Sequence, residues 1–134
     1  RLCARLTAAG LQVHSASRRQ HPDTPDFRHW PVDLLDFAAV ETLLDRVRPD
    51  YVFHLASHVQ GAPDIKHVLP ALHGNLVTTV NLLTAVAARG CRRVVLTGSF
   101  MEPDTTQGLA VPTSPYAAAK GAATLYGRMF GVLY

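Results

Sequence analysis

The chain has 134 residues, of which 48% are hydrophobic and 17% charged, with a formal net charge of +3. This composition is ordinary for a soluble globular domain, and without a stripe of Lys and Arg it argues against a nucleic-acid-binding module. The two cysteines lack CxxC spacing, which predicts neither a metal site nor a disulfide framework. No apolar run approaches the roughly 18 residues of a membrane span, so we expect a cytoplasmic protein.

The first half of the chain predicts helices and strands in alternation. In order, the expected elements are a helix over 1–9 stopped by Gly10, a strand over 11–17, a loop over 21–28, a short strand over 30–32, and a helix that Asp36 caps and Pro49 ends.

The second half continues the same alternation. In order, we expect a strand over 51–56, a loop over 57–63, a helix from about 65 or 70 to 89, a strand over 93–97, a loop over 98–113, and a helix with Ser114 as N-cap and Pro115 at its first position. The buried stripe of the long helix is expected at Leu76, Val80, Leu83 and Val86 or Ala87.

Strands that alternate with helices form parallel βαβ units, so the predicted fold class is α/β with a doubly wound, Rossmann-like parallel sheet. Ligands of such sheets bind outside the carboxyl ends of the strands. Four stretches of the chain are expected there: 17–19, 33–34, 56–60 and 97–102.

Tyr116 and Lys120 are four residues apart in an alanine-rich helix, which places both side chains on one face. A free phenol, with a pKa near ~10, is a poor base at neutral pH, and a nearby ammonium favours its ionised form. This spacing therefore predicts a proton shuttle. The alternative is a tyrosine that packs in the core and a lysine that extends its charge to water.

Four stretches together resemble the NAD(P)-dependent epimerase/dehydratase family, in the extended branch of the short-chain dehydrogenases/reductases. They are FHLAS at 53–57, NLVTTVNLL at 75–83, with Thr78 at a usual glycine, RVVLTGS at 93–99, and YAAAK at 116–120. The resemblance covers nearly the whole chain. It implies NAD(P)-dependent chemistry on a nucleotide-sugar, and a homodimer formed through the long helices that start near Asn75 and Tyr116.

The resemblance also implies a role for individual residues. Tyr116 would donate and accept the proton, Lys120 would favour the phenolate and bind the nicotinamide ribose, and Ser99 would hold the reacting hydroxyl or carbonyl. The implied cofactor-binding residues are Ser17, Arg18, Asp33, Leu34, Leu55, Ala56, Ser57, Asn75, Tyr116 and Lys120.

Three of these residues have a plainer interpretation. Ser99 could simply end a strand, Asn75 could be a helix N-terminal residue satisfied by backbone, and Asp33 could sit in a turn. The Ser99-to-Tyr116 spacing is also shorter than in most extended members, which makes the role of Ser99 less secure.

The end of the second predicted strand bears on the choice of cofactor. NAD users of this fold often have an acidic residue there for the ribose 2′-hydroxyl. This chain has Ser17 followed by Arg18 and Arg19, whose hydroxyl and guanidinium groups suit a 2′-phosphate. We therefore expect NADP(H) rather than NAD(H). The alternative is a pair of solvated surface arginines.

The chain departs from the dehydratases of the family just after the catalytic strand. Those members have an acid one or two positions after the Ser/Thr, where this chain has Phe100 and Met101, with Glu102 one place later. This favours 4-epimerase or ketoreductase chemistry over 4,6-dehydration. Phe100 and Met101 could instead line an apolar wall or the core.

We expect residues 1–134 to be a partial NAD(P)-binding domain. The first strand with its glycine-rich phosphate-binding turn would precede Arg1, and the substrate region would follow Tyr134. The chain alone should then have a gap at the centre of its sheet, bind cofactor poorly and be inactive. A rival function is a non-catalytic NADP-binding sensor or scaffold on the same fold.

Overall fold

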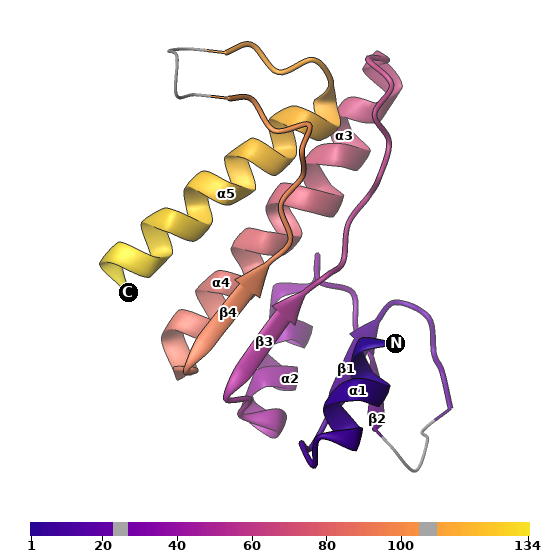
Figure 1. The fold of residues 1–134 in the computed structure, drawn as a ribbon, viewed down its shortest axis with the longest axis vertical. Coiled ribbons are helices and arrows are strands. Elements are labelled where there is room, and N and C mark those ends of the chain that lie inside the picture. The colour runs from indigo at the N-terminus through magenta and orange to yellow at the C-terminus, as the bar shows by residue number, and fades with distance from the viewer. Residues whose placement is uncertain (23–26, 105–109) are drawn as a thin grey trace.

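Helices and strands alternate along the chain, and the structure, a computed structural model, describes residues 1–22, 27–104 and 110–134 (Figure 1). The elements are α1 (Leu2–Ala8), β1 (His14–Ser17), β2 (Arg28–Pro31), α2 (Phe37–Val47), β3 (Tyr51–His54), the 3-10 turn η1 (Ile65–His67), α3 (Val68–Ala71), the π-helical η2 (Leu72–Val77), α4 (Thr78–Arg89), β4 (Arg93–Leu96) and α5 (Pro115–Leu133). Parts of the loops expected over 21–28 and 98–113 lie outside the described residues.

The strands pair in parallel, as the alternation predicts. β1 pairs with β2 from His14 opposite Arg28, and β3 pairs with β4 from Tyr51 opposite Arg93. Within the described ranges these are two separate two-stranded sheets. The predicted α/β class and the predicted gap at the centre of the sheet are therefore both present.

The strands β1, β3 and β4 are shorter than the sequence predicts, and β2 is shifted towards the N-terminus. β1 begins at His14 instead of residue 11, β2 covers 28–31 instead of 30–32, β3 ends at His54 and β4 ends at Leu96. A strand extends only as far as its partner strand supplies hydrogen bonds. In each of these two pairs, four residues of one strand are paired with four residues of the other. The Val13 carbonyl still accepts from the Arg28 N–H at 3.2 Å, just before the paired residues begin.

The predicted helix ends are confirmed by their hydrogen bonds. The Asp36 side chain accepts from the Ala39 N–H at 3.1 Å, and the Ser114 hydroxyl accepts from the Ala117 N–H at 3.1 Å. Pro115 stands in the first turn of α5, where its missing N–H costs nothing. Gly10 and Gly90 follow α1 and α4 with φ of 79° and 78°, a conformation that favours glycine.

The hydrophobic core lies between α2, α4 and the β3–β4 pair. Its buried residues are Val40, Leu44, Leu82, Ala85 and Val86, with Val52 and Val94 of the strands packed against them. In contrast, α1 has no buried residue.

The predicted buried stripe of the long helix is only partly correct. Leu83 and Val86 are buried, but Leu76 and Val80 are half-buried and Ala87 is exposed. The π-helical turn at η2 inserts an extra residue into the helical repeat. It therefore rotates the faces before and after it relative to one another, a change that a regular period cannot anticipate.

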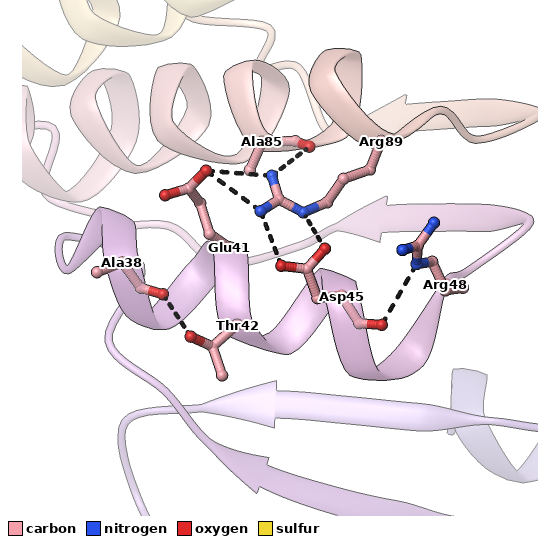
Figure 2. Close-up of polar contacts among 7 residues, drawn as sticks. All are labelled: Ala38, Glu41, Thr42, Asp45, Arg48, Ala85 and Arg89. Atoms are coloured by element: carbon pink, nitrogen blue, oxygen red, sulfur yellow. Dashed lines mark hydrogen bonds and ion pairs between the residues drawn. The ribbon is translucent and has the colours of Figure 1, made fainter.

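An ion-pair network joins α2 to α4 at the outer side of the core (Figure 2). Arg89 donates to both carboxylate oxygens of Asp45, at 2.7 and 2.9 Å, and to Glu41 at 3.2 Å. The hydrogen bond from Arg89 is the main cause that lowers the pKa of Asp45. The two helices are thus tied together at their surface as well as through apolar contacts.

The helical segment from Ile65 to Arg89 differs from one expectation. It has 25 residues and a mean hydropathy of 1.2 in its most apolar window, enough by length and composition to cross a membrane. However, 44% of that window is buried inside the protein. Core helices of soluble proteins share these properties, so the segment is weak evidence for a membrane span.

Candidate active site

Lys120 and Tyr116 lie on α5 where that helix passes the end of β4. Their exposed fractions are 7% and 8%, and Ser114 caps the start of the same helix. The Lys120 ammonium donates to the carbonyl of Thr97, the first residue after β4. The structure therefore places the predicted lysine at the strand tip, with the tyrosine one helical turn before it.

His54, the last residue of β3, is buried beside this lysine, with 6% of its surface exposed. Burial, together with the charge of Lys120, lowers the pKa of His54 to about 4, so the ring is neutral at pH 7. Its Nε2 lies 3.0 Å from the Thr79 hydroxyl, which itself donates to the Asn75 carbonyl at 2.6 Å. Because the hydroxyl proton is thus used, His54 Nε2 is the donor.

Asn75 is 2% exposed and holds the loop that follows β3. Its side-chain oxygen accepts from the Ser57 hydroxyl at 2.7 Å and from the His58 N–H at 2.9 Å. Its side-chain nitrogen donates to the His58 carbonyl at 3.0 Å. Asn75 lies inside a continuous helix, so it is not a helix N-terminal residue, but the His58 backbone satisfies its side chain, as that plainer interpretation expected.

The loop after β3 also carries Leu55 and Ala56, both exposed at the strand tip, as cofactor contact would require. The His58 side chain has a buried Nε2 without a hydrogen-bond partner in the described parts of the chain. Sequence reasoning did not single out His54, Thr79 or His58. A histidine inside an apolar strand was the available signal for the first of them.

Ser99 is half-buried in the loop after β4, and its hydroxyl oxygen accepts from the Met101 N–H at 3.2 Å. That bond leaves the hydroxyl proton available for donation. Phe100 is 100% exposed, which excludes it from the core. The Glu102 carboxylate accepts a hydrogen bond from the Ser99 N–H at 2.6 Å.

Four of the predicted cofactor-binding residues lie at the tips of the other strand pair: Ser17, Arg18, Asp33 and Leu34. The Ser17 hydroxyl donates to the Arg19 carbonyl at 3.0 Å, and Arg18 is exposed. The Asp33 carboxylate accepts from the Leu35 N–H at 3.0 Å, so it does form a turn. Asn81 of α4 donates to the Leu34 carbonyl at 2.9 Å and fixes that turn.

Parallel strand pairs, helical crossovers and a polar site at the strand tips together define a Rossmann-like α/β protein. The sequence profile of the NAD dependent epimerase/dehydratase family matches residues 1–131, and the chain belongs to this family. The resemblance noted from the four motifs is thereby confirmed.

Individual relatives agree with this assignment. The UDP-glucose 4-epimerase of Mycolicibacterium smegmatis is 32% identical over 130 residues, which are 91% of this chain and 40% of the relative. MoeE5 in complex with UDP-glucuronic acid and NAD is 28% identical, with a TM-score of 0.81 over 98% of this chain and 45% of that one. The UDP-glucose 4-epimerase of Thermus thermophilus, in complex with NAD, is 26% identical, with a TM-score of 0.74 over 96% and 45%. The chain thus spans less than half the length of these relatives.

Proposed function

We propose that residues 1–134 are the cofactor-binding part of a nucleotide-sugar 4-epimerase or ketoreductase, with Tyr116 as its proton shuttle. The observation that carries this proposal is the buried Lys120, which reaches the tip of β4 from the helix of Tyr116. The substrate class is supported by the UDP-sugars named for the relatives.

The donor set at the strand tips fits a nicotinamide ribose. An ammonium has three donors, and one of those of Lys120 is used by the Thr97 carbonyl. The others suit ribose hydroxyls, beside the exposed backbone of Leu55 and Ala56. When bound, the nicotinamide supplies hydride transfer to and from a sugar carbon.

The side chains of the chain perform the proton chemistry. Tyr116 takes the proton of the sugar hydroxyl as a phenolate and returns it as a phenol, while Ser99 donates a hydrogen bond to the same sugar oxygen. An epimerase would retain its cofactor between the two hydride transfers, whereas a reductase would exchange it.

The finer cofactor preference is part of the proposal. Exposed guanidinium groups at Arg18 and Arg19 support NADP(H), although the two solved relatives described above contain NAD. Dissociation constants for NADPH and NADH, measured with the intact protein and with Arg18→Ala, test the preference. We expect the substitution to weaken NADPH binding selectively, and equal weakening of both would contradict it.

We further propose a cytoplasmic homodimer that binds neither nucleic acid nor membranes. Exposed apolar side chains on the second half of α5 support a helical interface: Leu125, Tyr126, Met129, Val132 and Leu133. We also propose that the 134-residue chain alone binds cofactor poorly, because its two strand pairs form separate sheets in the part of the chain that the structure describes. Measurable cofactor affinity of the isolated chain would contradict this.

The reaction is tested by incubating the intact protein with UDP-sugars, 4-keto forms included, and both the oxidised and the reduced form of NADP or NAD, while following absorbance and products. Product with loss of reduced cofactor identifies a reductase, and product without that loss identifies an epimerase. Cofactor binding with no turnover of any UDP-sugar would overturn the proposal in favour of a sensor or scaffold.

A further inference from the structure

We infer that Glu102 and Thr124 form a clamp that fixes Ser99 against the helix of Tyr116, so that Glu102 is a positioning residue and not an acid of the reaction. The catalytic part of this inference rests on the proposed function. The clamp itself rests only on contacts of the described residues.

Glu102 uses both carboxylate oxygens within the protein. One accepts from the Ser99 N–H at 2.6 Å, and the other accepts from the Thr124 hydroxyl at 2.7 Å. The Glu102 N–H also donates to the Ser99 carbonyl at 3.1 Å, which closes a turn over residues 99–102. Hydrogen bonds to an ionised carboxylate are stronger than those between neutral groups. The carboxylate therefore holds the backbone of Ser99 itself.

Thr124 occupies the same face of α5 as the proposed catalytic pair. Tyr116, Lys120 and Thr124 follow one another at four-residue intervals, so their side chains line one stripe of the helix. Lys120 binds the Thr97 carbonyl, and Thr124 binds Glu102. The segment 97–102 is thus linked to α5 on both sides of Ser99.

Close packing of α5 on the end of β4 accompanies these two links. A Cβ at Gly127 would lie 2.6 Å from a methyl carbon of Leu96, and one at Gly121 would lie 3.0 Å from Cδ of Pro103. A side chain at either position would require the Leu96 side chain, the Pro103 ring or the helix to shift. The glycines therefore allow the approach that the short side chain of Thr124 needs.

The hydrogen bonds indicate different roles for the Ser99 hydroxyl and the Glu102 carboxylate. Among the described residues, the Ser99 hydroxyl accepts from the Met101 N–H and its proton is available for a substrate oxygen, whereas both oxygens of Glu102 are engaged. An acid that drives water elimination must deliver a proton to the leaving hydroxyl. The role of Glu102 is instead to fix the position of Ser99 relative to Tyr116.

The test uses four variants of the intact protein: Thr124→Val, Thr124→Ser, Glu102→Gln and Glu102→Ala. Thr124→Val keeps the shape of the side chain but removes the hydroxyl that donates to Glu102, whereas Thr124→Ser retains that hydroxyl. The readouts are the hydrogen exchange rate of the Ser99 amide, kcat and KM for the nucleotide-sugar, and the pH–rate profile.

We expect Thr124→Val and Glu102→Ala to speed exchange at Ser99 while the amides of β4 keep their protection. Both should lower kcat by up to about 100-fold with little change in KM, and Thr124→Ser should restore the wild-type values. Glu102→Gln should keep the shape of the pH–rate profile. Loss of one limb of that profile in Glu102→Gln, or a wild-type product that has lost water, would show an acid and overturn the inference.

The exchange measurement separates failure of the clamp from failure of the proposed function. Unchanged Ser99 exchange in both Thr124→Val and Glu102→Ala removes the clamp, whatever the activity. A wild-type protein that is inactive on every UDP-sugar removes the proposed function, while the exchange rates still decide whether the clamp exists. Global unfolding of Glu102→Ala would expose the β4 amides too, and the Thr124 pair then decides the outcome.

Discussion

The tips of the two strand pairs are built differently. At the end of β3 and β4, buried side chains from the helices hold both loops: Asn75 holds the loop after β3, and Lys120 contacts the residue after β4. At the end of β1, the half-buried Ser17 is followed by Arg18 and Arg19, which are both exposed.

The exposed loop is held mainly from within its own sheet. His29 of β2 contacts the Arg19 carbonyl through Nε2 at 2.8 Å and the Ser15 hydroxyl through Nδ1 at 2.9 Å. The helix nearest in sequence, α1, buries no residue. The proposed chemical end is therefore fixed by the helix layer. At the other end, Asn81 of α4 holds only the turn after β2, and the loop after β1 is a surface feature. Fixed geometry matters most where bonds change.

The largest expected effect is on turnover at the buried end. Tyr116→Phe removes the hydroxyl that moves the proton and should lower kcat by about 100- to 10,000-fold, while cofactor dissociation constants change little. Tyr126→Phe is the matched control, because Tyr126 is an exposed tyrosine of the same helix. Steady-state kinetics of both variants make the comparison, and retained turnover in Tyr116→Phe would remove that residue from its role.

The second-largest effect is expected on the free energy of unfolding. It compares a substitution in the hydrophobic core with one in α1. Leu82→Ala removes a buried side chain of α4 and should lower the free energy of unfolding by about 2–5 kcal/mol. Leu6→Ala, in a helix without buried residues, should cost clearly less. Urea unfolding of the intact protein measures both changes. Equal losses would show that the two regions are equally packed.

A third effect concerns the pH dependence of stability. The folded pKa of His54 is about 4, below its ordinary value of 6.5, so the unfolded chain binds the additional proton between these two values. Stability should therefore fall as pH drops from 6.5 to 4, by about 3 kcal/mol in total. His54→Gln should flatten that part of the curve in urea titrations at stepped pH. A curve unchanged by the substitution would contradict the buried neutral ring.

The smallest effect is expected at the surface network of α2 and α4. Arg89→Gln leaves Asp45 and Glu41 without their cation and should lower the melting temperature modestly, less so in high salt. Because the pKa of Asp45 is lowered by Arg89, this contribution is present at neutral pH and is lost as acid protonates the carboxylate. Lys66→Gln, which breaks an exposed pair within one turn, is the control and should change nothing.

Local features of the sequence were sufficient for the fold class and the helix ends. A capping side chain such as Asp36 or Ser114 acts on an amide only three residues away, so the sequence alone predicts it. Strand ends depend on a partner elsewhere in the chain, which explains why β1 begins later than predicted.

The site was predicted in part for the same reason. The helical spacing of Tyr116 and Lys120 is local, whereas the contact of Lys120 with Thr97 joins residues 23 apart. The bonds of His54 to Thr79 and of Thr124 to Glu102 join residues 25 and 22 apart. No pattern in the sequence indicates such pairs, because they depend on how α4 and α5 lie against the strands.

A structure of the intact protein with cofactor and a UDP-sugar bound tests the central claim most directly. We expect the nicotinamide ribose within about 3 Å of the Lys120 ammonium and the reacting sugar hydroxyl between Tyr116 and Ser99. A nicotinamide bound away from the tips of β3 and β4, with Lys120 unchanged on the Thr97 carbonyl, would contradict the account.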